Sequence, residues 1–245
     1  MGHDVELSVV APAHNEAENL PVFVAEVASA MAAIGRSWEL IVVDDASTDD
    51  GVALLRDLMG RHQQLRVVLL SRRTGQTGAL TAGLAVTRGR FIAMLDADCQ
   101  NEPRDVGLML EKLEEEALDM VNGWRKTRQD NWLRLVSTRV ANWVRNRLTH
   151  EHIQDSASGI KVFRAACLER IRLYDGMHRF LPTLFRLEGF RVAEMPVSHR
   201  PRSAGRAKYG VWNRVFRALG DALAVRWMRS RLLRYEAREL ERNDA

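Results

Sequence analysis

Four short apolar segments alternate with three segments of helical pattern over the first hundred residues, and this alternation limits the possible folds more than any other feature. Nearly continuous apolar segments separated by single helices are typical of βαβ units, in which the strands run parallel. The pattern predicts an α/β fold with a mostly parallel sheet and flanking helices. The expected strands are 7–11, 40–44, 67–70 and 91–95, and the expected helices are 16–33, about 50–61 and about 77–87.

The second half of the chain has a more mixed pattern. Strands are expected at 119–123, 158–163 and 191–197, with a helical stretch at 178–187. Two amphipathic helices with many basic residues are also expected, one at 132–148 and a long one from residue 211 onward. A chain of 245 residues can bury a full core as one large α/β domain with a helical appendage.

Polar residues directly follow three of the expected strands. They are His14, Asn15 and Glu16 after the first strand, Asp44 and Asp45 after the second, and Asp96 and Asp98 after the fourth. Because ligands of parallel sheets bind at the carboxyl ends of the strands, we expect these residues to form one site. The first strand is not followed by G-x-G-x-x-G, the main sign of a dinucleotide-binding fold. The P-loop motif G-x-x-x-x-G-K-[ST] does not occur either, so neither of these two kinds of nucleotide-binding site is expected.

The Asp96-Ala97-Asp98 sequence indicates a cation site. Two carboxylates one residue apart at the end of a strand can both turn toward one hard cation. Mg²⁺ and Mn²⁺ prefer oxygen ligands and usually keep some water molecules while they bind a diphosphate. The alternative is a helix cap together with a solvated acidic residue in a loop.

Basic residues are concentrated in two stretches. Residues 199–245 contain 12 Lys and Arg against 5 Asp and Glu, although the whole chain has a net charge of only +4. Residues 122–148 contain seven basic residues, and Asp130 is their one acidic residue. Such a concentration favours an anionic partner, which includes phosphates, lipid head groups and nucleic acid. The alternative is the solvated face of a helix.

Three motifs, in their order and spacing, resemble glycosyltransferase family 2. They are residues 10–16 (VAPAHNE), 42–49 (VVDDASTD) and 96–100 (DADCQ). Two later stretches, 154–164 (QDSASGIKVFR) and 199–210 (HRPRSAGRAKYG), are similar to motifs of its polyprenyl-phosphate group, which includes dolichyl-phosphate mannose synthase. The resemblance implies a GT-A-like fold, related to the Rossmann fold, with a C-terminal amphipathic helix.

The resemblance also implies how a nucleotide-diphosphate sugar donor would bind. Pro12, Asn15 and Glu16 would line the pocket for the base and ribose, and Asp45 would contact the base or ribose. Asp96 would help to hold the ribose or the sugar. The implied donor is of the GDP-mannose or UDP-glucose type.

A divalent cation is part of the same implication. Asp98 and Gln100 would bind Mg²⁺ or Mn²⁺ on the diphosphate, and family members carry Asp, Gln or a similar residue at the position of Gln100. The implied organisation is a glycosyltransferase domain at 1–210, with a nucleotide-sugar half at about 1–118, an acceptor half at 119–210, and a basic helical tail at 211–245.

The acceptor implied by the resemblance is a polyprenyl phosphate, to which the hexose would pass with inversion. A phosphate monoester is already anionic near neutral pH, so it needs a basic cradle rather than a strong general base. Guanidinium groups match phosphate geometry, and the candidates are Arg125, Arg128, Arg202 and Lys208. The alternatives are transfer to a soluble or polysaccharide acceptor, and nucleotide-sugar binding without transfer.

The expected location is the cytoplasmic face of a membrane, with peripheral attachment. No apolar run approaches the ~18 residues that span a bilayer, and the start of the chain lacks a basic-then-apolar leader. Trp212, Phe216 and Trp227 lie among arginines in the last expected helix, a composition typical of helices at a membrane surface. The alternative is a helix that faces the core. A nucleic-acid partner is not expected, because the sequence shows no recognised motif for a helix that binds in a DNA groove or for a sheet on which bases stack.

Overall fold

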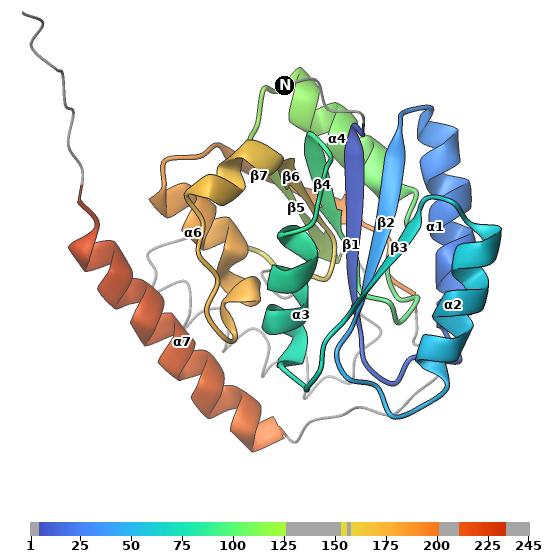
Figure 1. Cartoon of the computed structure of the whole chain (residues 1–245). Helices are drawn as coiled ribbons and strands as arrows, with labels where there is room; N and C mark the ends of the chain where they lie inside the picture. Colours follow the sequence, from blue (N-terminus) through green and yellow to red (C-terminus); the bar gives the residue numbers. More distant parts are fainter. Residues whose placement is uncertain (1–4, 126–152, 156–157, 201–210, 234–245) are drawn as a thin grey trace, which may run out of the picture.

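A seven-stranded sheet forms the centre of the computed structural model, which describes residues 5–125, 153–155, 158–200 and 211–233 (Figure 1). The strand order is β3-β2-β1-β4-β6-β5-β7. The strands are β1 (Leu7–Ala13), β2 (Trp38–Asp44), β3 (Leu65–Leu69), β4 (Phe91–Met94), β5 (Met120–Arg125), β6 (Lys161–Arg164) and β7 (Val192–Val197).

The sheet is mostly parallel, as expected, and β6 is the strand that runs in the opposite direction. β1 pairs in parallel with β2 and β4, and β2 pairs in parallel with β3. β6 is antiparallel to both β4 and β5, with Lys161 opposite Met94 and Asn122, and β5 is parallel to β7. The start of β6 therefore lies at the same edge of the sheet as the carboxyl ends of the other strands.

Helices cover both faces of the sheet (Figure 1). One face packs against α1 (Leu20–Ile34), α2 (Gly51–Arg61) and α4 (Asp105–Glu115). The other packs against α3 (Gly75–Leu84), the 3₁₀ turns η1 (Ala165–Glu169) and η2 (Met177–Phe180), α6 (Leu181–Leu187) and α7 (Val211–Arg231).

The two covered faces explain why the strands are almost continuously apolar. Val9 and Ala11 of β1 belong to the core beneath α1, α2 and α4, whereas Val10 between them belongs to the core on the α3 side. Successive side chains of a strand point to opposite faces, so most positions of a strand that is buried on both sides are apolar.

The predicted starts of α1 and β6 differ from those in the structure. α1 begins at Leu20 rather than Glu16, because Asn15 adopts a left-handed backbone (φ 52°) and the residues after it form a turn. β6 begins at Lys161 rather than residue 158. The predicted helix at 132–148 lies outside the described residues.

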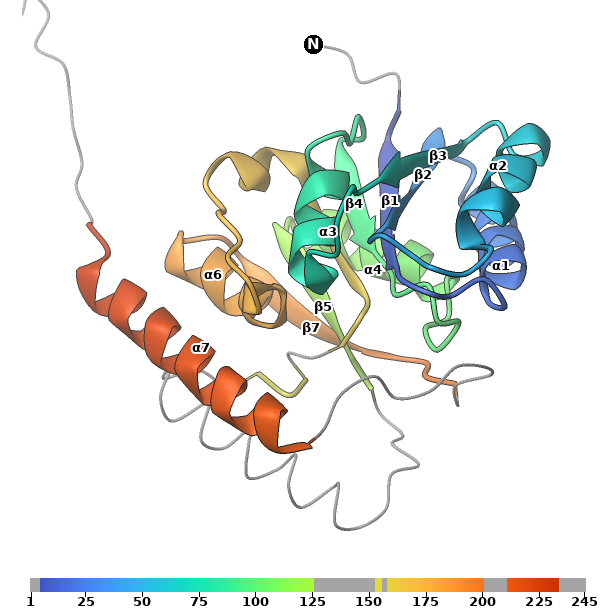
Figure 2. The same ribbon diagram turned by 60° about the horizontal axis from the view of Figure 1, so that its bottom comes forward.

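The long C-terminal helix, α7, packs one side against the core and exposes another. Ala222 and Val225 are buried in the core cluster on the α3 side, whereas Leu223 and Trp227 are 50% and 64% exposed. α7 lies on the opposite side of the molecule from α1 and α2 (Figure 2). Within the described residues, no helix combines the length and the apolar character that crossing a bilayer requires.

Gly83 allows α3 to lie directly on the sheet, and this contact generates a prediction. A Cβ atom at Gly83 would lie 2.5 Å from Val10 Cγ1 and 2.8 Å from Val43 Cγ2, both in the core. We expect Gly83→Ala to lower the free energy of unfolding by roughly 1–3 kcal/mol through overpacking. Gly60→Ala in α2, where a Cβ meets nothing within 4 Å, is the control and should not destabilise. Urea denaturation measures the stability of both variants. Equal unfolding midpoints for the two variants would contradict the close approach of α3 to the sheet.

Candidate functional site

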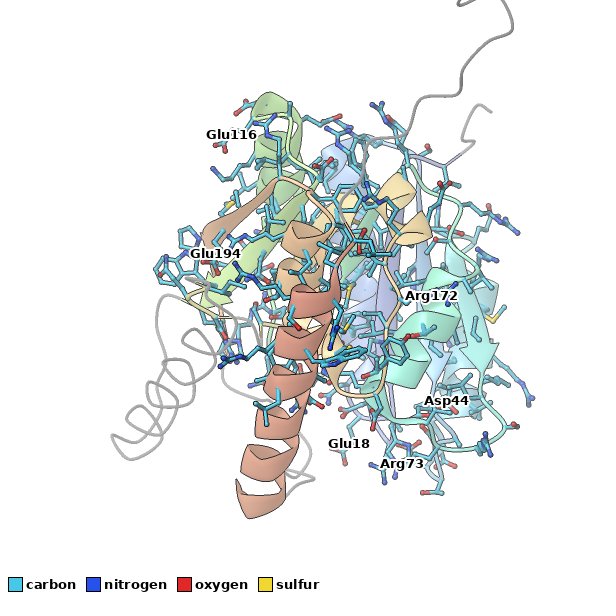
Figure 3. The ribbon with its side chains drawn as sticks, turned by 90° about the vertical axis from the view of Figure 1, so that its left-hand side faces the viewer. Glu18, Asp44, Arg73, Glu116, Arg172 and Glu194 are labelled. Atoms are coloured by element: carbon cyan, nitrogen blue, oxygen red, sulfur yellow. The ribbon has the colours of Figure 1, made fainter. Side chains whose placement is uncertain are left out.

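The polar residues predicted to form a site lie at one edge of the sheet, the edge where β1, β2 and β4 end. Glu18, Asp44 and Arg73 lie at this end of the molecule, opposite to Glu116 (Figure 3). The three loops that follow these strands are joined by hydrogen bonds between their side chains and backbone.

Asn15 joins the loop after β1 to the loop after β2. Its side-chain Oδ1 accepts a hydrogen bond from the backbone amide of Thr48 (2.8 Å), and its backbone amide donates to Ser47 Oγ (2.9 Å). The Ala17 amide donates to Asp49 Oδ2 (3.0 Å) beside it. Asn15 therefore fixes the shape of both loops, a role that its position in the sequence did not indicate.

Pro12 and Glu16 flank this junction. Pro12 lies within β1, opposite Val43 of β2, and Glu16 Oε2 accepts a hydrogen bond from Asn19 Nδ2 (2.7 Å). The residues predicted to line the pocket for the base and ribose thus lie at the same edge of the sheet as Asp45.

Asp45 is buried and connects β2 to the start of α3. Its Oδ1 accepts hydrogen bonds from the Thr74 amide (2.6 Å) and hydroxyl (3.0 Å), and its Oδ2 accepts one from the Gly75 amide (2.8 Å). A carboxylate is favoured there, because the first amides of a helix lack partners within the helix. Asp45 therefore positions the loop before α3, a contact that the sequence did not predict.

Asp98 and Gln100 lie on either side of a tight turn between β4 and α4. Cys99 between them has a left-handed backbone (φ 57°), and the Gln100 amide donates to Asp98 Oδ1 (3.3 Å). Both side chains are half-buried. They offer a carboxylate and an amide oxygen, a donor set that suits Mg²⁺ or Mn²⁺ if diphosphate and water supply the other ligands. No group of three or more His, Cys, Asp or Glu side chains suitable for a metal occurs among the described residues.

Cys99 itself is not suited to act as a nucleophile. Burial, together with the negative charges of Glu26 and Asp98, raises the pKa of its thiol to about 11. The thiol stays protonated near neutral pH, and the thiolate is the form that attacks substrates.

Asp96 lies against the loop before β6. Its Oδ1 accepts a hydrogen bond from Gln76 Nε2 of α3 (2.8 Å). A Cβ atom at Gly159 would lie 2.1 Å from Asp96 Oδ2 and 2.8 Å from Asn101 Nδ2. Gly159 is therefore required for the loop before β6 to approach the Asp96 carboxylate this closely.

Lys161 is a buried cation close to this carboxylate, and the sequence did not indicate a role for it. Its side chain is fully buried and its Nζ donates to the Ser158 carbonyl. Burial lowers the pKa of Lys161 to about 8, although the negative charges of Asp96 and Asp155 act in the opposite direction. The available signal was the position of Lys161 within the 154–164 stretch, which resembles a motif of the polyprenyl-phosphate group.

Arg125 at the end of β5 forms a two-pronged ion pair with Asp155. Its Nε donates to Oδ2 (2.7 Å) and a terminal nitrogen donates to Oδ1 (3.0 Å), with both side chains largely buried. The predicted phosphate-binding residue Arg125 thus lies at the expected edge, with two of its nitrogens directed to Asp155. The other three predicted basic residues, Arg128, Arg202 and Lys208, lie outside the described residues.

Solved structures of similar shape identify the fold. A mannosyltransferase from Pyrobaculum calidifontis in complex with GDP-Man and Mn²⁺ matches with a TM-score of 0.62 and 18% identity, over 94% of this chain and 77% of that chain. Glucosyl-3-phosphoglycerate synthase from Mycobacterium tuberculosis, in complex with Mn²⁺, UDP-glucose and glycerol 3-phosphate, matches with a TM-score of 0.63 and 21% identity, over 94% and 82%. The fold is the GT-A fold of glycosyltransferases, as expected.

The chain belongs to glycosyltransferase family 2, whose model matches residues 8–172. It is 40% identical over 238 residues to the dodecaprenyl-phosphate galacturonate synthase of Rhizobium johnstonii, covering 96% of this chain and 69% of that protein. It is 31% identical over 210 residues to the undecaprenyl-phosphate 4-deoxy-4-formamido-L-arabinose transferase of Aeromonas hydrophila, covering 85% of this chain and 64% of that protein. The resemblance to family 2 is confirmed, and the protein is a glycosyltransferase.

The contact between Gly159 and Asp96 generates a prediction. We expect Gly159→Ala to displace the Asp96 carboxylate or Asn101 and to slow sugar transfer on the order of 100-fold, because small misplacements of a binding group are costly. The transfer rate and the melting temperature should be measured on the same samples, with Gly60→Ala as the control. A variant with the wild-type rate would show that Asp96 does not need this position.

Proposed function

We propose that the protein transfers a sugar from a nucleotide-diphosphate donor to a polyprenyl phosphate at a membrane surface. The observation that carries the proposal is the turn of Asp98 and Gln100, which lies at the strand edge beside the loops that follow β1 and β2. The two relatives above support the acceptor, since both names include a polyprenyl phosphate.

In this proposal the loops after β1, β2 and β4 hold the donor. Pro12, Asn15 and Glu16 line the pocket for base and ribose, Asp45 fixes the neighbouring loop and contacts the nucleoside, and Asp96 holds the ribose or sugar. These loops belong to the proposed nucleotide-sugar half, residues 1–118. We propose a donor of the GDP-mannose or UDP-glucose type, and the sugars named in the relatives widen the set to be tested.

Asp98 and Gln100 would hold Mg²⁺ or Mn²⁺. The two neighbours of the same fold described above are complexes with Mn²⁺. A cation bound there would act as a Lewis acid that stabilises the charge of the leaving diphosphate. The acceptor half, residues 119–210, holds the phosphate of the acceptor by Arg125, Arg128, Arg202 and Lys208. The acceptor oxygen then attacks C1 of the sugar from the side opposite to the diphosphate, which inverts the configuration.

The exposed side of α7 supports attachment to a membrane. Leu223 and Trp227 are one helical turn apart and exposed, and Arg226, Arg229 and Arg231 are exposed on the same helix. An apolar pair among arginines suits an interface with anionic lipid. The buried Ala222 and Val225 keep the opposite side on the core, so the exposed side is the one available to lipid.

The reaction is tested by the release of nucleoside diphosphate from a panel of UDP- and GDP-linked sugars. Each donor is incubated with and without polyprenyl phosphate, and with Mg²⁺, Mn²⁺ or a chelator. We expect release that requires both lipid phosphate and metal, and we expect Asp98→Asn to slow it on the order of 100-fold, because it removes a charged cation ligand.

The matched control is Asp57→Asn, which removes an exposed carboxylate paired with Arg61 on α2 and should leave the rate unchanged. If no donor shows release that depends on lipid, the proposed acceptor is wrong, and soluble acceptors should be tested next. If chelation has no effect, the proposed cation site is wrong.

The membrane attachment is tested with vesicles that contain anionic lipid. We expect Leu223→Ser with Trp227→Ser to weaken sedimentation with the vesicles on the order of tenfold, because two apolar side chains no longer enter the interface. Leu108→Ser on α4, which removes an equally exposed leucine (52%), is the control and should bind as the wild type does. Equal binding of all three proteins would exclude this side of α7 as the contact.

A further inference from the structure

The segment that follows β7 is attached to the cation-binding turn by its backbone. His199 forms an antiparallel bridge with Asn101, and the Arg200 amide donates to the Gln100 carbonyl (2.8 Å). One residue earlier, the Ser198 amide donates to Asp105 Oδ2 (2.7 Å) at the start of α4. These contacts join residues nearly one hundred positions apart in the sequence.

The side chain of Arg200 also forms ion pairs with two other segments of the chain. One terminal nitrogen donates to Glu26 Oε1 of α1 (2.7 Å), and the other donates to Glu102 Oε2, just after the cation-binding turn. The planar guanidinium, with donors in a fixed fork, can hold both carboxylates at once. The two hydrogen bonds to these carboxylates also raise the pKa of Arg200 above its ordinary value.

The turn that Arg200 fastens is one that requires external support. Cys99 is not a glycine, yet it has a left-handed backbone (φ 57°), and such a conformation persists where surrounding contacts determine it. The contacts at this turn include the thiol of Cys99 to the Asn19 carbonyl (3.7 Å), the Gln100 amide to Asp98 Oδ1 (3.3 Å) and the pairing of Gln100 with Arg200.

The pairing also sets the orientation of the Gln100 side chain. Its Nε2 donates to the Arg200 carbonyl (3.4 Å), which makes the amide oxygen the end available to a cation. Partners of this kind, behind the ligands of a metal, fix ligand orientation and affect the affinity for the metal.

We propose that Arg200 is a positioning residue, which holds the turn from Asp98 to Glu102 in the conformation that presents Asp98 and Gln100 to the cation. The inference rests on the cation site of the proposed function, and it adds a residue outside that site. In this proposal Arg200 acts without touching the cation or the substrate. It acts through the two carboxylates and through the backbone of residues 100–101.

A simple electrostatic effect and the positioning role predict opposite changes in the affinity for the cation when Arg200 is removed. Loss of the Arg200 charge leaves Glu26 and Glu102 unneutralised near the site, which alone would make cation binding tighter. Positioning predicts weaker binding, so the direction of the change decides between them. The ion pairs line an open cleft beside α1, so water can reach the carboxylates when the arginine is removed.

The test measures Mn²⁺ binding by electron paramagnetic resonance of free Mn²⁺, with UDP and with GDP. We expect Arg200→Met to weaken binding on the order of tenfold. Arg200→Lys keeps the charge but cannot span both carboxylates, so it should fall between Arg200→Met and the wild type. Unchanged or tighter binding by Arg200→Met would overturn the proposal.

The matched control is Arg36→Met, which removes a two-pronged pair with Glu114 of similar exposure, remote from the turn. It should bind Mn²⁺ as the wild type does. Hydrogen exchange supplies a readout that needs no cation: residues 96–102 should exchange faster in Arg200→Met and not in Arg36→Met. If the wild type binds no Mn²⁺ with either nucleotide, the cation site of the proposed function fails, and unchanged exchange would then overturn the positioning role separately.

Discussion

The pairing of β1 with β2 and β4 is the interaction on which the rest of the structure depends. Parallel pairing places the carboxyl ends of these strands at one edge, so that the loops carrying Asn15, Asp45 and Asp98 become neighbours. The strands are buried on both faces, which leaves the edge as the place where polar side chains can gather. Apolar packing thus holds the sheet together, and the polar side chains gather at the edge where β1, β2 and β4 end.

Charged and polar groups at this edge bind one another across elements. Asp45 takes three hydrogen bonds from the loop before α3, and Arg125 and Asp155 pair between β5 and the segment before β6. Lys161 places a buried charge near the Asp96 and Asp155 carboxylates. Groups held in this way before a ligand binds need little reorganisation when charge develops in a reaction.

Much of the fold could be predicted from the sequence, because each strand and helix has a local pattern. The apolar strands, the mostly parallel sheet and the gathering of Asp45, Asp96 and Asp98 at one edge follow from spacing alone. The reversed direction of β6 and the attachment of Arg200 to Gln100 depend on pairings between distant residues, for which a single sequence carries no periodic signal. The left-handed residues at Asn15 and Cys99 were equally hidden, since neither is a glycine.

The insertion of β6 between β4 and β5 has a consequence for how the chain can fold and be divided. β4 pairs with β1 on one side and with β6 on the other, although Met94 and Lys161 are far apart in the sequence. A fragment that stops near residue 118 would leave β4 as an open, apolar edge, and such edges pair with other chains. Residues 1–118, the proposed nucleotide-sugar half, are therefore not expected to fold as an autonomous unit. During synthesis the sheet can close only after β6 has left the ribosome, and this long-range contact makes folding slow.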